Sequence, residues 1–381
     1  MRWLLVSIVL SSLVLAGCNS SVASEEEEGE ETYHLVLNSS QHPPYFDWEP
    51  KYYAVEEFTQ LVEERTNNQV TFDIYYSNQL AGQRESADAL ARGTYDMQEV
   101  NGAFWTERIP ELYVVSLMFW NYGEEHTLHM MRNTEFGELY EQSLEDYGIK
   151  LMHFWPASVT GYMSSTPLAS MSDMNGLIMN QTSNLAMDYH QQVGAGIATM
   201  PTVEQYEGLM RGTLDAIQFP FYSLETYRYV EVVDYISLPT LNPAISMVTI
   251  NQDSWDELPE DIQEIMIEAS QEVEMKAAEA SKAMTERAFE FANENDVTCV
   301  GMDREDFENM QSAVKTHLWG KYASINERTE RMVDVLEEET ERWLEANPEF
   351  KQYFDPYLTD YSGGEEDERN HSNNESNNYC E

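Results

Sequence analysis

Hydrophobic and polar residues follow two different periods along this chain. Tyr33 to Leu37 alternates as a strand does, whereas Tyr52 to Arg65 repeats its apolar residues at the spacing of one helical face. β-branched and aromatic content marks further strands, and Gly or Asn residues end the helices. The first part of the chain therefore predicts, in order, a strand at Tyr33–Leu37, a polar loop at Asn38–Pro44, a helix at Tyr52–Arg65, a strand at Val70–Tyr76 and a helix at Arg84–Arg92.

The pattern restarts after Tyr147 and ends in long helical stretches. Pro259 to Asn293 runs almost without a break at a helical period, which is long enough to pack across two lobes. Alternating strands and helices predict a mainly parallel sheet covered by helices. The fold class is therefore α/β, with two lobes crossed by a long helix. The other elements predicted here are strands at Lys150–Trp155, Leu177–Met179 and Leu214–Phe219, and helices at Asn184–Val193, Val203–Arg211 and Ala313–Trp343.

The N-terminus has the pattern of a bacterial lipoprotein signal. Arg2 supplies a positive charge, Trp3 to Val14 an apolar stretch, and Leu15-Ala16-Gly17-Cys18 a cleavage site. The apolar stretch is too short to span a bilayer, which argues against a transmembrane anchor. We expect cleavage before Cys18 and lipid attachment to Cys18, so that the mature protein is held outside the cytoplasmic membrane, in the periplasm or at the cell surface.

Charge is the next strong constraint. The chain has 69 acidic and 21 basic residues, a formal net charge of -48, and such a surface repels nucleic acid. Its 42% hydrophobic and 12% aromatic content predicts a folded core rather than disorder. Acid spread over a folded protein is typical of adaptation to high salt, so we expect a halophilic source. Cys299 is expected to be a small buried side chain, and no disulfide framework is predicted.

Several collinear segments resemble one family. The "NQLAGQRE" loop and the following "ALARGTYDM" lie within Phe58–Trp105, and "SDMNGLIMN" and "GLMRGTLDAIQFP" lie within Ser165–Asn180 and Met200–Pro220. In this order the segments resemble the DctP-type extracytoplasmic solute receptors of tripartite ATP-independent periplasmic (TRAP) transporters. The resemblance covers roughly Tyr33 to Tyr361. Each segment alone is a weak indicator, but their common order is specific.

The resemblance implies a receptor, not an enzyme, whose two lobes close on a small-molecule solute by hinge motion. It implies as partners the small and large membrane subunits of a TRAP permease, and a lipid anchor would raise the receptor's effective concentration beside them. The expected boundaries are a signal peptide at 1–17, a lipid-anchored acidic tether at 18–31, lobe I at 32–154 with about 244–285, lobe II at 155–243 with about 286–361, and a disordered acidic tail at 362–381.

The residues that clamp a carboxylate in this family differ here. The resemblance places Asn180 where the family has an arginine that binds the carboxylate through two hydrogen bonds, Met163 where it often has a second arginine, and Phe219 where it often has an asparagine. A buried carboxylate without a cation is costly, so we expect a neutral or cationic ligand. A basic residue such as Arg84 reaching the ligand from another direction is the alternative.

Aromatic walls and amides would hold such a ligand. The resemblance places Phe104, Trp105, Trp155, Phe219 and Tyr222 at the pocket walls. Aromatic faces suit amine cations, and Glu99 could supply a counter-charge. Against this, Trp155 could equally be a core aromatic, Glu99 an ordinary solvated carboxylate and His42 a turn residue. The predicted ligand-binding residues are Asn180, Gln218, Phe219, Asn101, Phe104, Trp105, Trp155, Glu99 and Tyr222.

Two other function classes remain open at this point. An exported lipoprotein hydrolase would need a catalytic motif, but no Gly-x-Ser-x-Gly, His-Glu-x-x-His or phosphate-binding loop occurs. A receptor for a signalling partner instead of a permease has no distinguishing feature in the sequence. We predict no catalytic residue, no metal and no cofactor.

Overall fold

The structure is a computed structural model that describes residues 31–181, 184–200 and 202–359. The predicted signal peptide, Cys18 and the tail at 362–381 lie outside the described residues, as does all but the last residue of the predicted tether. The elements below belong to one compact unit, which begins at Thr32 and whose described part ends at residue 359. None of the helices in the described ranges has the length and apolar character needed to cross a membrane.

The strands form a single mixed sheet, with order β2-β1-β3-β9-β4-β7-β5-β6, to which β8 and β10 are added beside β4. Pairing is parallel among β1, β2 and β3, and among β5, β6 and β7, as the sequence predicts. Pairings of β4 and β9 are antiparallel, which the prediction missed. The strands are β1 (Tyr33–Ser39), β2 (Val70–Tyr75), β3 (Met97–Asn101), β4 (Ile149–Ser164), β5 (Ile178–Asn180), β6 (Gly196–Ala198), β7 (Ala216–Pro220), β8 (Tyr235–Ser237), β9 (Asn242–Asn251) and β10 (Thr298–Val300).

Strand β4 joins the two halves of the sheet. It pairs with β9 from Ile149 to Thr160 and with β7 from Thr160 to Ser164, and its register with β9 shifts twice, after Leu151 and after Pro156. It is 16 residues long, whereas the sequence predicts only Lys150–Trp155. Nearly all of its side chains are buried on both faces, so it has no polar alternation to mark its length.

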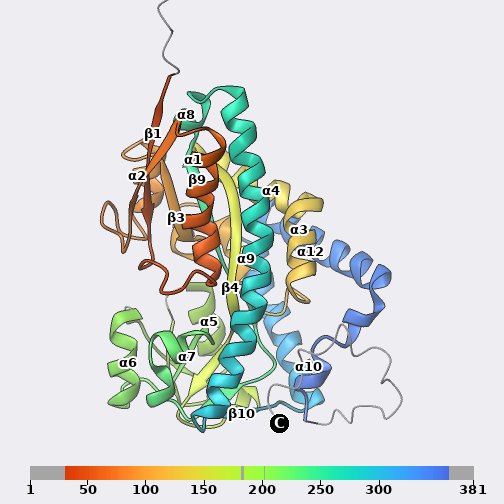
Figure 1. Ribbon diagram of the computed structural model, residues 1–381. Coiled ribbons are helices and arrows are strands. Elements are labelled where there is room, and N and C mark those ends of the chain that lie inside the picture. The colour runs from red at the N-terminus through yellow and green to blue at the C-terminus, as the bar shows by residue number, and fades with distance from the viewer. Residues whose placement is uncertain (1–30, 182–183, 201, 360–381) are drawn as a thin grey trace, which may run out of the picture. The chain divides into compact units, whose positions relative to one another are not determined.

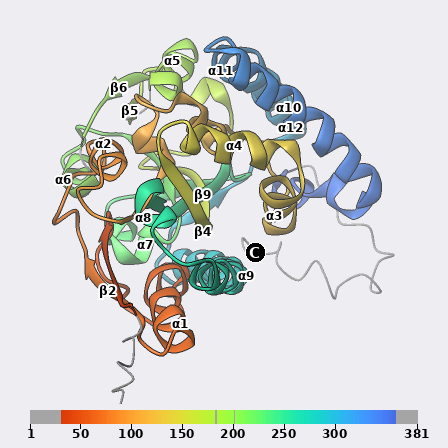
Figure 2. The ribbon, with the colours of Figure 1, turned by 90° about the horizontal axis from the view of Figure 1, so that it is seen from above.

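The helices cover both sides of β4 and β9. Helix α9 has 35 residues, as the unbroken helical pattern predicts, and runs along β4 (Figure 1). Figure 2 shows α9 and α1 on one side of β4 and β9, and α3, α4 and α12 on the other. The α-helices are α1 (Phe58–Arg65), α2 (Ser86–Ala91), α3 (Glu124–Asn133), α4 (Glu135–Glu145), α5 (Asn184–Gln192), α6 (Thr202–Met210), α7 (Ser223–Thr226), α8 (Gln252–Asp256), α9 (Glu260–Glu294), α10 (Arg304–Ala313), α11 (Gly320–Ala323) and α12 (Glu327–Ala346).

Shorter helical segments extend several of these. The predicted helix at Tyr52–Arg65 is confirmed, although its first turns form a π-helix before α1. The predicted helix at Ala313–Trp343 is interrupted, because Asn326 caps α12 and so starts a new helix. The segments are the π-helices η1 (Tyr52–Glu57) and η6 (Val314–Trp319), and the 3-10 helices η2 (Gly102–Trp105), η3 (Pro110–Ser116), η4 (Met171–Met174), η5 (Tyr229–Glu231), η7 (Pro348–Gln352) and η8 (Asp355–Tyr357).

The buried face of helix α9 consists largely of small side chains. Ala269, Val273 and Ala277 pack in a core with β1, α1 and β9, and Ala288 and Phe289 pack in another with β7, α7 and β8. The long helix therefore contributes to two separate cores along its length. Cys299 on β10 is disulfide-bonded, so the prediction for this residue is wrong.

Candidate ligand-binding site

One pocket gathers residues from four elements that are far apart in the sequence. We call it the Lys51 pocket; its empty space, part of it open to solvent, is about 300 Å³. Its lining comes from the loop after β1, the middle of β4, the start and end of α7, and α9. The lining residues are Gln41, His42, Glu49, Pro50, Lys51, Trp155, Ala157, Tyr222, Thr226 and Met284.

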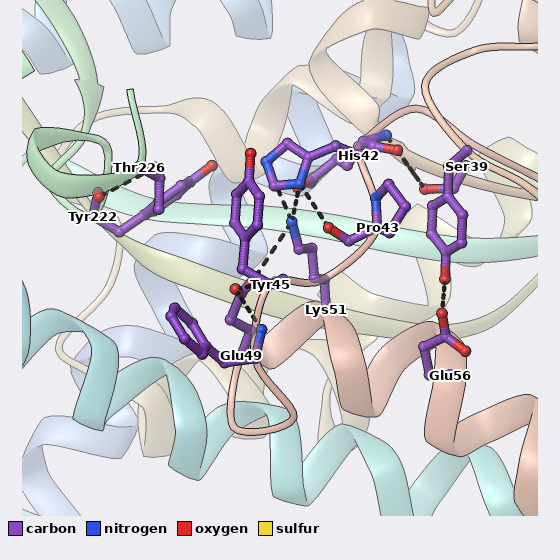
Figure 3. Close-up of polar contacts among 12 residues, drawn as sticks. Ser39, His42, Pro43, Tyr45, Glu49, Lys51, Glu56, Tyr222 and Thr226 are labelled. Carbon is purple, nitrogen blue, oxygen red and sulfur yellow. Dashed lines mark hydrogen bonds and ion pairs between the residues drawn. The ribbon is translucent and has the colours of Figure 1, made fainter. Parts of the chain in front are cut away.

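The loop after β1 carries a buried cation with its counter-ion (Figure 3). Lys51 is 7% exposed, and its Nζ lies 3.3 Å from Glu49 Oε2 and 2.9 Å from His42 Nδ1. Glu49 is 4% exposed, and its Oε1 accepts the backbone N–H groups of Tyr45 and Phe46, which fixes the loop around the carboxylate. The sequence therefore folds this loop around one ion pair.

Burial governs the electrostatics of this loop. It lowers the pKa of Lys51, and the carboxylates of Glu49 and Glu99 oppose this shift. It also lowers the pKa of His42, which favours the neutral imidazole. The pocket thus holds one cation, one paired carboxylate and one neutral ring.

Glu99 lies behind the wall of the pocket rather than in its lining. The residue is 1% exposed on β3, and its Oε2 accepts hydrogen bonds from Ser39 Oγ at 2.9 Å and from the backbone N–H and the hydroxyl of Ser40. Burial raises the pKa of Glu99, although these hydrogen bonds and Lys51 oppose the shift. The alternative of an ordinary solvated carboxylate is wrong, because this carboxyl belongs to a buried network.

Trp155 and Tyr222 are the two predicted residues that line the pocket. Trp155 on β4 is 1% exposed, and its indole Nε1 is buried with no hydrogen-bond partner among the described residues. Tyr222 precedes α7 and is half-buried, and burial raises the pKa of its hydroxyl well above the usual range. The pocket therefore combines aromatic surface with an unused donor.

The other lobe-II candidates are engaged with the protein. Asn180 Oδ1 accepts the backbone N–H of Met200 at 2.7 Å, and Gln218 Oε1 accepts a hydrogen bond from Gln181 Nε2 at 3.0 Å. Phe219 packs edge-on against two tyrosine rings, Tyr227 and Tyr229. None of these three predicted residues lines the Lys51 pocket.

The predicted residues after β3 serve the structure locally. Asn101 Oδ1 accepts the N–H of Ala103 and so caps η2, and Phe104 packs against the largest core. Trp105 is fully buried and donates its indole N–H to Ser86 Oγ at 2.8 Å. These contacts keep Asn101, Phe104 and Trp105 outside the lining of the Lys51 pocket.

Met163 and Arg84, the two other positions considered for binding a carboxylate, do not line the Lys51 pocket. Met163, on β4 beside Ile217 of β7, is fully buried in the core that includes α7 and α9. Arg84 is exposed and forms a salt bridge with Glu107 at 2.8 Å, away from the pocket lining. The cation that does line the pocket is Lys51, which the sequence analysis missed along with Glu49. In the sequence, the only indication that these two residues belong to a site is that a lysine and a glutamate lie in a proline-containing loop.

A second pocket, of about 370 Å³, lies across β4. Phe154, Pro156 and Ser158 line it, whereas the intervening Trp155 and Ala157 face the Lys51 pocket. It contains none of the predicted site residues, and no unpartnered buried polar atom of the described chain lines it. The Lys51 pocket is therefore the better candidate. No group of His, Cys, Asp and Glu with the arrangement of a metal site occurs in the described ranges.

Comparisons with known proteins agree with this architecture. The DctP family, described as bacterial extracellular solute-binding protein, family 7, matches residues 47–325. The 2,3-diketo-L-gulonate-binding periplasmic protein YiaO of Escherichia coli is 24% identical over 221 residues, which are 58% of this chain and 67% of that protein. The C4-dicarboxylate-binding periplasmic protein DctP of Rhodobacter capsulatus is 26% identical over 243 residues, 63% of this chain and 73% of that protein.

Solved structures share the fold. A TRAP periplasmic solute-binding protein from Desulfovibrio salexigens, crystallised with bound orotic acid, superposes with a TM-score of 0.73 at 22% identity. The match covers 82% of this chain and 99% of that chain. The predicted fold class, two α/β lobes crossed by a long helix, is confirmed.

Proposed function

Because the chain belongs to the DctP family of bacterial extracellular solute-binding proteins, we propose that it captures a small solute by lobe closure and delivers it to the small and large membrane subunits of a TRAP permease. Proteins of this family bind solutes for transport and are not enzymes. The hydrolase alternative has no support from the relatives, and no feature of the chain favours the signalling alternative.

We further propose that the solute binds in the Lys51 pocket. The observation that carries this proposal is the origin of the lining: the loop after β1 comes from the expected lobe I, Tyr222 and Thr226 from the expected lobe II, and β4 and α9 pass between them. Closure of the two lobes would therefore change the pocket directly. The boundaries of the lobes given above, with β4, β9 and α9 as the connecting elements, are part of the same proposal.

The charge of the pocket supports a neutral or cationic solute. Glu49 already pairs with Lys51, Glu99 lies close behind, and no arginine lines the pocket. An anionic solute would add another negative charge to this partly buried group, which is unfavourable without a further cation. The relatives are named for carboxylates, 2,3-diketo-L-gulonate and C4-dicarboxylates, so the proposed solute would be a departure from those of the relatives.

Lipid attachment at Cys18 and location outside the cytoplasmic membrane complete the proposal. The family's members named here are periplasmic proteins, and the sequence pattern around Cys18 supports the anchor. Metabolic labelling with a radioactive fatty acid tests the anchor: label should enter the wild-type chain and not the Cys18→Ala variant. Equal labelling of both would contradict it.

A thermal-shift screen of the chain from Asn19 onward, in molar salt, tests the solute. Organic acids, sugars, polyols, amines and betaines are compared, because a ligand that binds only the folded state raises the melting temperature. The proposal predicts the largest shift among neutral or cationic solutes. A larger shift with a simple carboxylate would contradict the charge assignment, and turnover of the solute would contradict the receptor assignment.

A further inference from the structure

The indole of Trp155 differs from those of the three other most deeply buried tryptophans among the described residues. Three other tryptophan indoles, Trp105, Trp120 and Trp319, each donate a hydrogen bond to a protein oxygen at 2.8–3.1 Å. Trp155 Nε1 has no such partner in the described part of the chain, although the residue is 1% exposed. A buried donor without an acceptor loses its hydrogen bonds to water and forms none in the protein, which costs free energy of folding. Native proteins therefore rarely contain such a donor unless it has a function.

The position of Trp155 indicates the reason. The residue lies in the middle of β4, where it lines the Lys51 pocket and also packs in the core with β1, α1 and α9. Resting on the function proposed above, we propose that the N–H of Trp155 donates to an oxygen of the bound solute and so selects solutes that present a hydrogen-bond acceptor there. The donor is left unused in the free protein and satisfied in the complex.

Lys51 supplies a second donor to the same pocket. Its ammonium group carries three N–H bonds and is paired with Glu49, and it contacts the ring of His42, whose Nδ1 also lies 2.7 Å from the carbonyl oxygen of Pro43. The remaining N–H can turn toward a solute oxygen. Pro50, Ala157 and Met284 provide apolar surface around the two donors. A pocket with two donors and an apolar wall fits a solute that has an acceptor oxygen at one end and an apolar body.

The two donors and the neighbouring carboxylates limit the net charge that the solute can carry. A cation that carries only donors has nothing to offer Trp155 Nε1, and it would also approach the ammonium of Lys51. An anion would bring its charge beside Glu49 and Glu99. The solute class is therefore a molecule without net charge that carries a carbonyl, hydroxyl or internally balanced carboxylate oxygen.

Three planar fragments of nearly equal shape separate these cases. Acetamide is neutral with an acceptor oxygen, acetate is its anionic counterpart and acetamidinium its cationic counterpart with donors only. The protein from Asn19 onward is labelled with 15N in its tryptophan indoles. Each fragment is then titrated into it in molar salt, and the indole N–H resonances are followed by NMR. The Trp155 resonance is identified by its absence in Trp155→Phe, and Trp255, which lies outside the pocket lining, is the internal control.

The proposal predicts that acetamide shifts the Trp155 resonance saturably while Trp255 stays in place. The perturbation should be stronger than that from acetamidinium, and Trp155→Phe should weaken acetamide binding, measured by calorimetry, by roughly threefold to tenfold. Trp255→Phe should leave it unchanged. No shift with acetamide, or an equal response to acetamidinium, would overturn the role of Trp155. A stronger response to acetate than to acetamide would leave Trp155 as a ligand donor but overturn the claim of a solute without net charge, and with it the charge assignment of the proposed function.

Discussion

The ion pair between Lys51 and Glu49 should behave as one energetic unit. The two side chains are 9% and 6% exposed, with Nζ and Oε2 3.3 Å apart. Replacing Lys51 by Met leaves the Glu49 carboxylate buried without its cation, and replacing Glu49 by Gln leaves the ammonium in the same position. Either single change exposes the cost of an uncompensated buried charge, whereas the double change removes both charges together.

The magnitude follows from the geometry. At 3.3 Å and an effective dielectric constant of about 20, the attraction is about 5 kcal/mol before desolvation is subtracted. Glu49 keeps the N–H groups of Tyr45 and Phe46, and Lys51 keeps His42, so each single variant should lose about 2–3 kcal/mol of unfolding free energy. The double variant should lose no more than one single variant, which gives a coupling energy of roughly 2 kcal/mol.

The assay is urea unfolding of wild type, Lys51→Met, Glu49→Gln and the double variant at constant molar salt, followed by circular dichroism. Because the pair is buried, salt should not remove the coupling. A matched cycle on the exposed pair of Arg211 and Glu207, whose side chains are 67% and 61% exposed, should show no measurable coupling. Additive losses at Lys51 and Glu49 would refute the account of this loop.

Three further changes have defined outcomes. Asn180→Arg should create or strengthen binding of a small carboxylate, measured by calorimetry. Asn180→Ala, which loses the same hydrogen bond to the loop before α6, should not. If Asn180→Arg gains affinity for no acid, Asn180 does not lie where the family binds its ligand. Burial lowers the pKa of His153 to about 3, below its unfolded value, so its contribution to stability is complete above about pH 6.5 and is lost as the pH falls. His153→Gln should therefore reduce the loss of unfolding free energy between pH 7 and pH 5 by about 2 kcal/mol, and an unchanged pH dependence in urea unfolding would contradict this. Gly161→Ala should lower the melting temperature, because the added Cβ would lie 2.3 Å from Phe221 Cζ, while Gly196→Ala, with its nearest contact at 3.6 Å, should not; equal melting temperatures would show that Phe221 moves freely.

Regular periodicity made part of the fold predictable. Helix α9 keeps a helical pattern over 35 residues, and the parallel pairing of β1 with β2 follows from strand–helix–strand order. Strand β4 was predicted short because burial on both faces removes the alternation that marks a strand. The antiparallel insertion of β9 beside it could not be derived from local pattern, since β9 is also buried throughout.

The site was less predictable, for reasons that concern single side chains. The family resemblance placed Trp155 and Tyr222 among the candidates for the pocket walls, and both line the Lys51 pocket. Asn101 and Asn180 bind backbone groups instead, and an amide has the same appearance in the sequence whether it caps a turn or holds a ligand. Lys51 becomes a buried, paired cation only when the loop after β1 folds. Its partner Glu49 is two positions away in the sequence, and the two residues belong to no recognisable motif.

The most direct test of the receptor account is isothermal titration of the solute that gives the largest thermal shift. One solute should bind per chain and be recovered unchanged. The Tyr222→Ala substitution should raise the dissociation constant at least tenfold, because it removes an aromatic side chain that lines the Lys51 pocket. Chemical conversion of the solute, or an affinity that Tyr222→Ala does not alter, would contradict the account.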